Sequence, residues 1–160
     1  MNGPTLAGYL EFLRNIVGIN TTVLPDGSPI IEWSYNYAVN LVWEVLRYLP
    51  SPPDQFLYTT AVYNLATSFL LANGQDPTGL PVSQQFFGPY QQKYNLRAFV
   101  GGVIQSASDE STSSSMVVPK AFDGLTIQNL QNLKDPYGRQ YLAIVQSLGS
   151  LSLMLSLIHI

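Results

Sequence analysis

The sequence predicts a mainly α-helical fold, a small helical bundle built on a long antiparallel helix pair, with a short β-hairpin or extended arm and a C-terminal helix. Two long segments carry apolar residues at alternating steps of four and three, which is typical of helices packed lengthwise. A short proline-rich turn separates them, so the two helices should be antiparallel. We expect one domain of 160 residues, with a helical core over 1–100, a Ser-rich arm over 101–120 and a helical segment over 121–154.

The first helix is predicted from Thr5 to about Val17. Its apolar residues fall on one helical face and are followed by Gly18: Leu6, Tyr9, Leu10, Leu13, Ile16 and Val17. The next stretch, 20–29, contains Pro25-Asp26-Gly27, which favours a turn because proline and glycine preset the required backbone angles. We therefore predict a loop there.

The long helix pair is predicted over 30–49 and 54–73. The apolar seam of the first helix comprises Ile31, Tyr35, Ala38, Val42, Val45 and Leu49, and that of the second comprises Tyr58, Val62, Leu65, Phe69 and Ala72. Pro50, Pro52 and Pro53 end the first helix, because proline lacks the backbone donor and clashes with the preceding turn. Asp54 then offers a cap for the second.

The region after residue 73 is predicted to be less regular. A loop over 74–81 precedes a short helix near 83–94, which Gly88-Pro89 should interrupt. Two extended stretches, Val103–Ala107 and Ser115–Val118, flank a polar turn and predict a hairpin or arm. Because few of its residues could anchor it to a core, this arm should be mobile until a partner orders it.

Helical spacing returns after Pro119. A short helix with Leu125, Leu130 and Leu133 is predicted, with Thr126 as its cap. Asp135-Pro136 then supplies an N-cap and a first-turn proline for a last helix. The apolar residues of that helix are Tyr137, Tyr141, Ile144, Val145 and Leu148.

The composition favours a subunit that covers much of its surface with neighbours. Apolar residues make up 46% of the chain and charged residues 11%, against a usual charged share of about 25%. Ten Tyr and two Trp supply the large contact areas typical of interfaces. The seven Lys and Arg against ten Asp and Glu argue against tight nucleic-acid binding. The uncharged stretch 55–75 is long enough for a membrane span, but its Thr, Asn and Ser content favours a buried helix.

No pattern in the sequence indicates catalysis, and we predict no enzymatic activity, cofactor or metal. The last six residues, 155–160, match the peptide encoded by a common sequencing adapter, and we interpret them as a non-native tail. Without His159 no histidine remains, which leaves no Ser-His-Asp triad or histidine-ligated metal. The chain has no Cys, and its closest carboxylate pair, Asp109-Glu110, is typical of a hydrated turn. Trp33 and Trp43 could form an aromatic binding box, although core or interface positions are favoured.

The C-terminal part of the sequence resembles a known family. The residues that carry the resemblance are Gly102-Val103, Ser106-Ala107-Ser108-Asp109, Thr112-Ser113, Ser115 and Pro136-Tyr137-Gly138-Arg139-Gln140-Tyr141-Leu142. They resemble the head-tail connector, or adaptor, proteins of tailed double-stranded DNA bacteriophages, in which a Ser-rich strand pair precedes such a helix. The N-terminal part is similar only in its general arrangement of helices.

The resemblance implies a virion structural protein of the neck, assembled in the host cytoplasm. Such subunits form a ring of about a dozen copies beneath the portal protein and contact the next neck or tail protein, while DNA passes through without specific binding. The candidate arm contacts are Val103, Ser106, Ser108, Asp109, Thr112, Ser113, Ser115 and Val117, and the candidate C-terminal docking residues are Tyr137, Arg139 and Tyr141. The alternatives are a non-viral helical interaction module, another neck or tail-completion protein, and a membrane-associated protein.

Overall fold

The protein is mainly helical, as the sequence predicts. The computed structural model describes residues 3–46, 55–98, 106–109, 112–115 and 131–158. Its helices are α1 (Leu6–Phe12), the π-helix η1 (Leu13–Val17), α2 (Pro29–Leu46), α3 (Gln55–Asn73), the 3-10 helix η2 (Val82–Gln84), α4 (Phe87–Lys93) and α6 (Pro136–Ile158). Two strands, β1 (Ser106–Asp109) and β2 (Thr112–Ser115), form a hairpin. The predicted helix with Leu125 and Leu130 lies outside the described residues.

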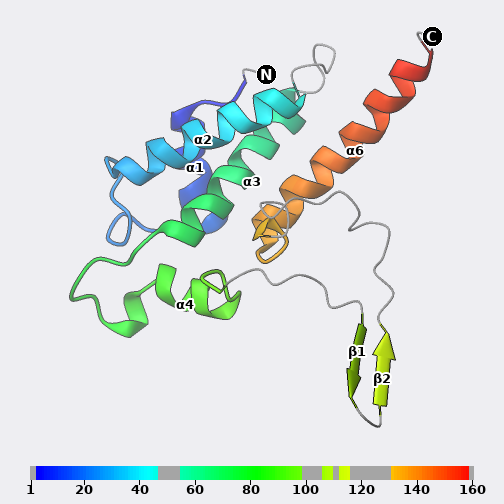
Figure 1. Cartoon of the computed structure of the whole chain (residues 1–160). Helices are drawn as coiled ribbons and strands as arrows, with labels where there is room; N and C mark the ends of the chain where they lie inside the picture. Colours follow the sequence, from blue (N-terminus) through cyan, green and yellow to red (C-terminus); the bar gives the residue numbers. More distant parts are fainter. Residues whose placement is uncertain (1–2, 47–54, 99–105, 110–111, 116–130, 159–160) are drawn as a thin grey trace.

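Helix α3 occupies the centre of the bundle. It packs against α2, α4 and α6, and it runs antiparallel to both α2 and α6 (Figure 1). Buried positions occur on all its sides: Ala61, Val62, Asn64, Leu65, Ala66, Thr67, Ser68, Leu70 and Leu71. The predicted seam is confirmed at Val62 and Leu65, whereas the seam residue Phe69 is only partly buried. A single apolar seam does not describe α3, because the helix has neighbours on several sides.

The interpretation of 55–75 as a buried helix agrees with this central position. In the described part of the chain, no helix combines the length and apolar character needed to cross a membrane.

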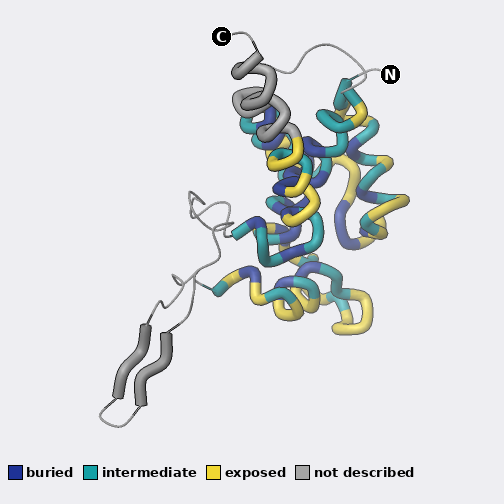
Figure 2. Tube along the Cα trace, turned by 90° about the vertical axis from the view of Figure 1, so that its right-hand side faces the viewer, coloured by how far each residue is buried: buried dark blue, intermediate teal, exposed yellow. Residues whose placement is uncertain are grey.

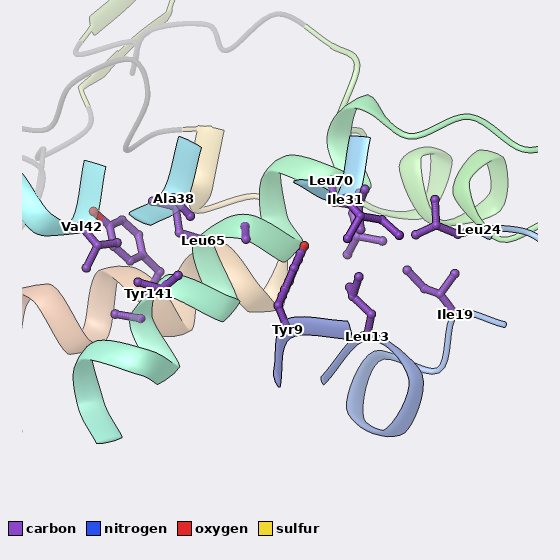
Figure 3. Close-up of a cluster of buried hydrophobic side chains, with 14 of the residues drawn as sticks. Tyr9, Leu13, Ile19, Leu24, Ile31, Ala38, Val42, Leu65, Leu70 and Tyr141 are labelled. Atoms are coloured by element: carbon purple, nitrogen blue, oxygen red, sulfur yellow. The ribbon is translucent and has the colours of Figure 1, made fainter. Parts of the chain in front are cut away.

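The hydrophobic core joins the N-terminal and C-terminal helices. Tyr9 and Leu13 lie against α3, and Tyr141 of α6 lies near Val42 and Ala38 of α2 (Figure 3). The burial pattern in Figure 2 places the buried positions along the faces where the helices meet. Helix α6 is therefore part of the same core as the long pair.

The first helix begins as predicted but changes its geometry before it ends. Thr5 caps α1, because its hydroxyl accepts a hydrogen bond of 3.0 Å from the Gly8 amide. From Leu13 the chain continues as the π-helix and stops at Gly18, whose φ of 83° is the left-handed conformation that favours glycine. The predicted loop 20–29 is confirmed up to Ser28, and α2 begins at Pro29.

One arginine holds this loop in place. The Arg14 guanidinium donates to the carbonyl oxygens of Ile19 (2.7 Å) and Leu24 (2.6 Å) and pairs with the Asp26 carboxylate. These bonds satisfy loop carbonyls that the helices cannot reach. Ile19 and Leu24 can therefore contribute buried side chains to the core even though they lie outside a helix.

The prediction that Gly88-Pro89 interrupts a helix is wrong. The break lies earlier, between η2 and α4, and both residues belong to the first turn of α4. The Asp76 carboxylate accepts hydrogen bonds from the amides of Phe86 (2.7 Å), Phe87 (3.0 Å) and Gly88 (2.7 Å). Partial burial opposes ionisation of Asp76, but these bonds outweigh it and lower its pKa. Pro89 has no amide hydrogen to satisfy, so it is well tolerated in this turn.

Candidate assembly surface

The hairpin is the first component of the candidate surface. Its antiparallel register pairs Ser106 with Ser115, Ser108 with Ser113 and Asp109 with Thr112. The strands lie closer to the turn than predicted, since Asp109 belongs to β1 and only two residues connect the strands.

The structure brings six of the eight candidate arm residues into this hairpin: Ser106, Ser108, Asp109, Thr112, Ser113 and Ser115. Val103 and Val117 lie outside the described residues. The hairpin stands apart from the helices (Figure 1). An isolated two-stranded hairpin is marginally stable at best in water, so a further surface is needed to stabilise it.

The second component is the end of the bundle from which the hairpin extends. It is formed by α4, the turn that follows it and the first turn of α6. The Gln91 amide donates to the carbonyl oxygens of Leu71 (2.9 Å) and Gly74 (2.7 Å), which attaches α4 to the end of α3. The Lys134 ammonium donates to the carbonyl oxygens of Asn95 (3.2 Å) and Ala98 (2.5 Å). The chain before the hairpin and the chain after it are therefore joined directly.

Asp135 links this end to the centre of the bundle. One carboxylate oxygen accepts a bond of 2.6 Å from the Ser68 hydroxyl of α3, and the other accepts bonds from the amides of Tyr137 (3.2 Å) and Gly138 (3.3 Å). The predicted N-cap is thus confirmed. The side chain is buried, and burial raises its pKa even though all these hydrogen bonds favour the charged form.

Asp135 should make the stability of the protein depend on pH. Because its pKa is raised from 3.8, the folded protein binds this proton more tightly than the unfolded chain does. The contribution of Asp135 to the free energy of unfolding is therefore greatest below pH 3.8 and falls as the pH rises through the folded-state pKa. We expect the free energy of unfolding of wild type to fall relative to that of Asp135→Asn as the pH rises from 3.8 through the folded-state pKa. Urea unfolding followed by circular dichroism measures this difference. A difference that grows in favour of wild type would contradict the raised pKa.

The three predicted docking residues of α6 have different environments. Arg139 is exposed and available to a partner. Tyr137 is half-buried, with its ring against Phe12 at 6.3 Å between centroids. The docking prediction is wrong for Tyr141, which is only 4% exposed and belongs to the core. The reason is that its position on the helical face points it toward α2 and α3.

A cluster of positive charge at this end was not predicted. Five Lys and Arg residues lie in the described part of the chain, and four of them gather here: Lys93, Arg97, Lys134 and Arg139. We call these four residues the cationic cluster. The ion pair between Arg14 and Asp26 lies among the described residues but includes none of these four side chains. In the segments 86–98 and 131–140 the sole carboxylate is Asp135, which is buried. The partly buried Asp76 carboxylate bonds the first turn of α4, so among the described residues the fully exposed charges of this end are positive.

A polar cavity of about 520 Å³ opens beside the cluster. Its lining comes from α3, the turn after α4 and the start of α6: Ser68, Phe69, Ala72, Asn73, Gln75, Leu96, Arg97, Gln131, Asn132 and Asp135. The Asp135 carboxylate is already engaged in structural hydrogen bonds, and within the described ranges no group of three or more His, Cys, Asp or Glu could hold a metal ion. The hydroxyl, amide and guanidinium groups that line the cavity suit it to polar contacts with another molecule.

A second exposed feature lies on α2. Trp33 is 59% exposed, so its side chain lies outside the core, and the interface position stays a prediction. Its ring packs edge-on against Phe69 at 4.7 Å, and it borders a shallow hollow of about 470 Å³ with Pro29, Ile30, Glu32 and Asn36. The side chain of Trp43 lies outside the described residues. Trp33 is therefore available for contact with another protein.

Comparison with protein-family models, curated proteins and solved structures finds no match.

Proposed function

We propose that this chain is a virion structural protein, a head-to-tail connector subunit that assembles as a ring beneath the portal and joins capsid to tail. The observation that carries the proposal is the polar hairpin that stands apart from its own bundle (Figure 1). Such an element contributes little to the stability of its own subunit and is suited to reach a neighbour. A ring multiplies each weak arm contact, so the ordering cost of one arm is offset by many copies acting together.

Two further features support this proposal. The Tyr137–Leu142 motif resembles the opening of the last helix in connector proteins, and here it begins the helix that follows the hairpin. The low charge content of 11% and the exposed Trp33 suit a subunit that covers much of its surface with neighbours. Exposed Trp33 also favours the alternative, a non-viral helical interaction module with its binding surface on α2.

Sedimentation velocity separates the two candidates. A connector subunit should appear as a monomer and a large ring whose share grows with concentration, whereas an interaction module should remain a monomer or dimer. Addition of the portal protein of the same virus should increase the ring fraction. A chain that stays monomeric or dimeric at high concentration with the portal present would contradict the connector function. We also expect the gene for this chain to lie between the portal gene and the tail genes.

Replacement of the hairpin should remove assembly and preserve the fold. In this variant a Gly/Ser linker of equal length takes the place of residues 106–115. We expect the free energy of unfolding to change by no more than about 0.5 kcal/mol, because the helices and their core are unaltered. Ring formation and portal binding should be lost in sedimentation. A large loss of stability would instead place the hairpin in the folding unit.

A further inference from the structure

The hollow beside Trp33 on α2 combines an aromatic ring with a carboxylate. Its volume is about 470 Å³, and it is lined by Pro29, Ile30, Glu32, Trp33 and Asn36. Asn36 follows Trp33 by three residues and Glu32 by four, so its side chain lies beside both on the surface of the helix. All three side chains are exposed. The hollow therefore offers an aromatic ring, a carboxylate and an amide to the same ligand.

The ring of Trp33 is held in position by its neighbours. It packs edge-on against Phe69 of α3 at 4.7 Å between centroids, and Phe69 packs in turn against Tyr37 at 4.6 Å. Tyr37 lies one turn after Trp33 on α2. A ring fixed in this way loses little conformational entropy when a partner covers it, which favours binding.

The Glu32 carboxylate decides which partner fits the hollow. An apolar side chain that covered the hollow would remove this carboxylate from water without pairing it, which is unfavourable. A guanidinium group can instead pair with the carboxylate through two parallel hydrogen bonds and stack on the indole of Trp33 by cation–π attraction. A lysine ammonium is a compact, strongly hydrated charge and lacks this planar geometry. The charge and shape of the hollow therefore match an arginine.

We propose that the hollow on α2 binds an arginine side chain of a partner protein. The guanidinium group lies between the Glu32 carboxylate and the Trp33 ring, and the side-chain oxygen of Asn36 is a further acceptor. Pro29 and Ile30 contact the aliphatic part of the arginine. Such a contact suits a neck protein and the partner of a non-viral interaction module alike, so its test does not depend on the proposed function.

A peptide titration of the full chain tests the contact. The probe is a capped Gly-Arg-Gly tripeptide, and the NMR signal of the Trp33 indole N–H, assigned by its loss in Trp33→Phe, reports binding. We expect a saturable shift, with an affinity at least about fivefold higher than for the same tripeptide with citrulline, which has nearly the same shape but no charge. Equal affinity for the two peptides would overturn the proposal. Equal or tighter binding of a Gly-Lys-Gly tripeptide would overturn the choice of arginine.

Glu32→Gln removes the charge of the hollow and keeps the shape of the side chain. We expect this variant to bind Gly-Arg-Gly at least about fivefold more weakly than wild type. Glu11→Gln is the matched control, because Glu11 is an exposed carboxylate on a different helix, and it should bind as wild type does. Wild-type affinity of Glu32→Gln would overturn the proposal. Circular dichroism checks that each variant is folded.

A second copy of the chain is the competing occupant of the hollow. Its contact would shift the Trp33 signal as the concentration of the chain rises without any peptide. A shift of this kind that persists in Glu32→Gln would make the hollow an apolar contact between copies and overturn the proposal. A complete lack of peptide binding would overturn the arginine contact and leave the connector function, which sedimentation tests, standing.

Discussion

Leu65→Asp is expected to destabilise the domain severely. Leu65 is fully buried at the centre of α3, between α2 and α6. An aspartate there would be a buried charge without a partner, which should lower the free energy of unfolding by about 4 kcal/mol. Single domains are usually stable by only about 5–15 kcal/mol, so this loss removes much of the total. Circular dichroism during urea unfolding should show a transition at much lower denaturant than for wild type.

Phe56→Asp is the matched control, because it replaces an apolar residue of the same helix with the same charge. Phe56 is 58% exposed, so the new carboxylate stays hydrated. We expect its free energy of unfolding to lie within about 0.5 kcal/mol of wild type. Equal behaviour of the two variants would show that Leu65 is not in the core.

Gly138→Ala should produce the second large effect. An added Cβ would lie 2.1 Å from the backbone carbonyl oxygen of Asn132, and backbone atoms cannot move aside as a flexible side chain can. Alanine normally stabilises a helix relative to glycine by about 1 kcal/mol. Here the clash should outweigh that gain and cost about 2 kcal/mol, because the first turn of α6 must shift and weaken the Asp135 cap. Thermal unfolding should register a lower melting temperature.

Gly27→Ala makes the same substitution where there is room. Nothing lies within 4 Å of a Cβ at Gly27, and its backbone angles are accessible to alanine. This variant should be neutral or slightly more stable than wild type, by up to about 1 kcal/mol, because alanine restricts the unfolded chain. A Gly138→Ala protein as stable as Gly27→Ala would refute the close approach at Asn132.

Local patterns in the sequence predict most of the helices. Asp135 caps α6 as expected, because the amides that it accepts from follow it directly in the sequence. The burial of Asn64 and Thr67 is not predicted, because it depends on helices that approach α3 from several directions. Residues such as Pro89 mislead for a similar reason: the cap that makes this proline acceptable comes from Asp76, 12 residues before Gly88.

The candidate surface is less predictable than the fold. The hairpin residues could be found from their polar composition and spacing. The cationic cluster could not, because Lys93 and Arg97 are separated in the sequence from Lys134 and Arg139, and only the folded chain places the two pairs together. The docking prediction for Tyr141 rests on the resemblance alone, and local sequence does not show that this tyrosine of α6 faces inward.

The Lys134 bonds to Asn95 and Ala98 have a consequence for how such a protein can change over evolution. They join the turn after α4 directly to the start of α6, on either side of the hairpin in the sequence. Exchange of the hairpin residues 106–115 would leave these bonds and the helices in place. One bundle could therefore acquire a different specificity by exchange of the segment alone, in the way that antibody frameworks carry different loops.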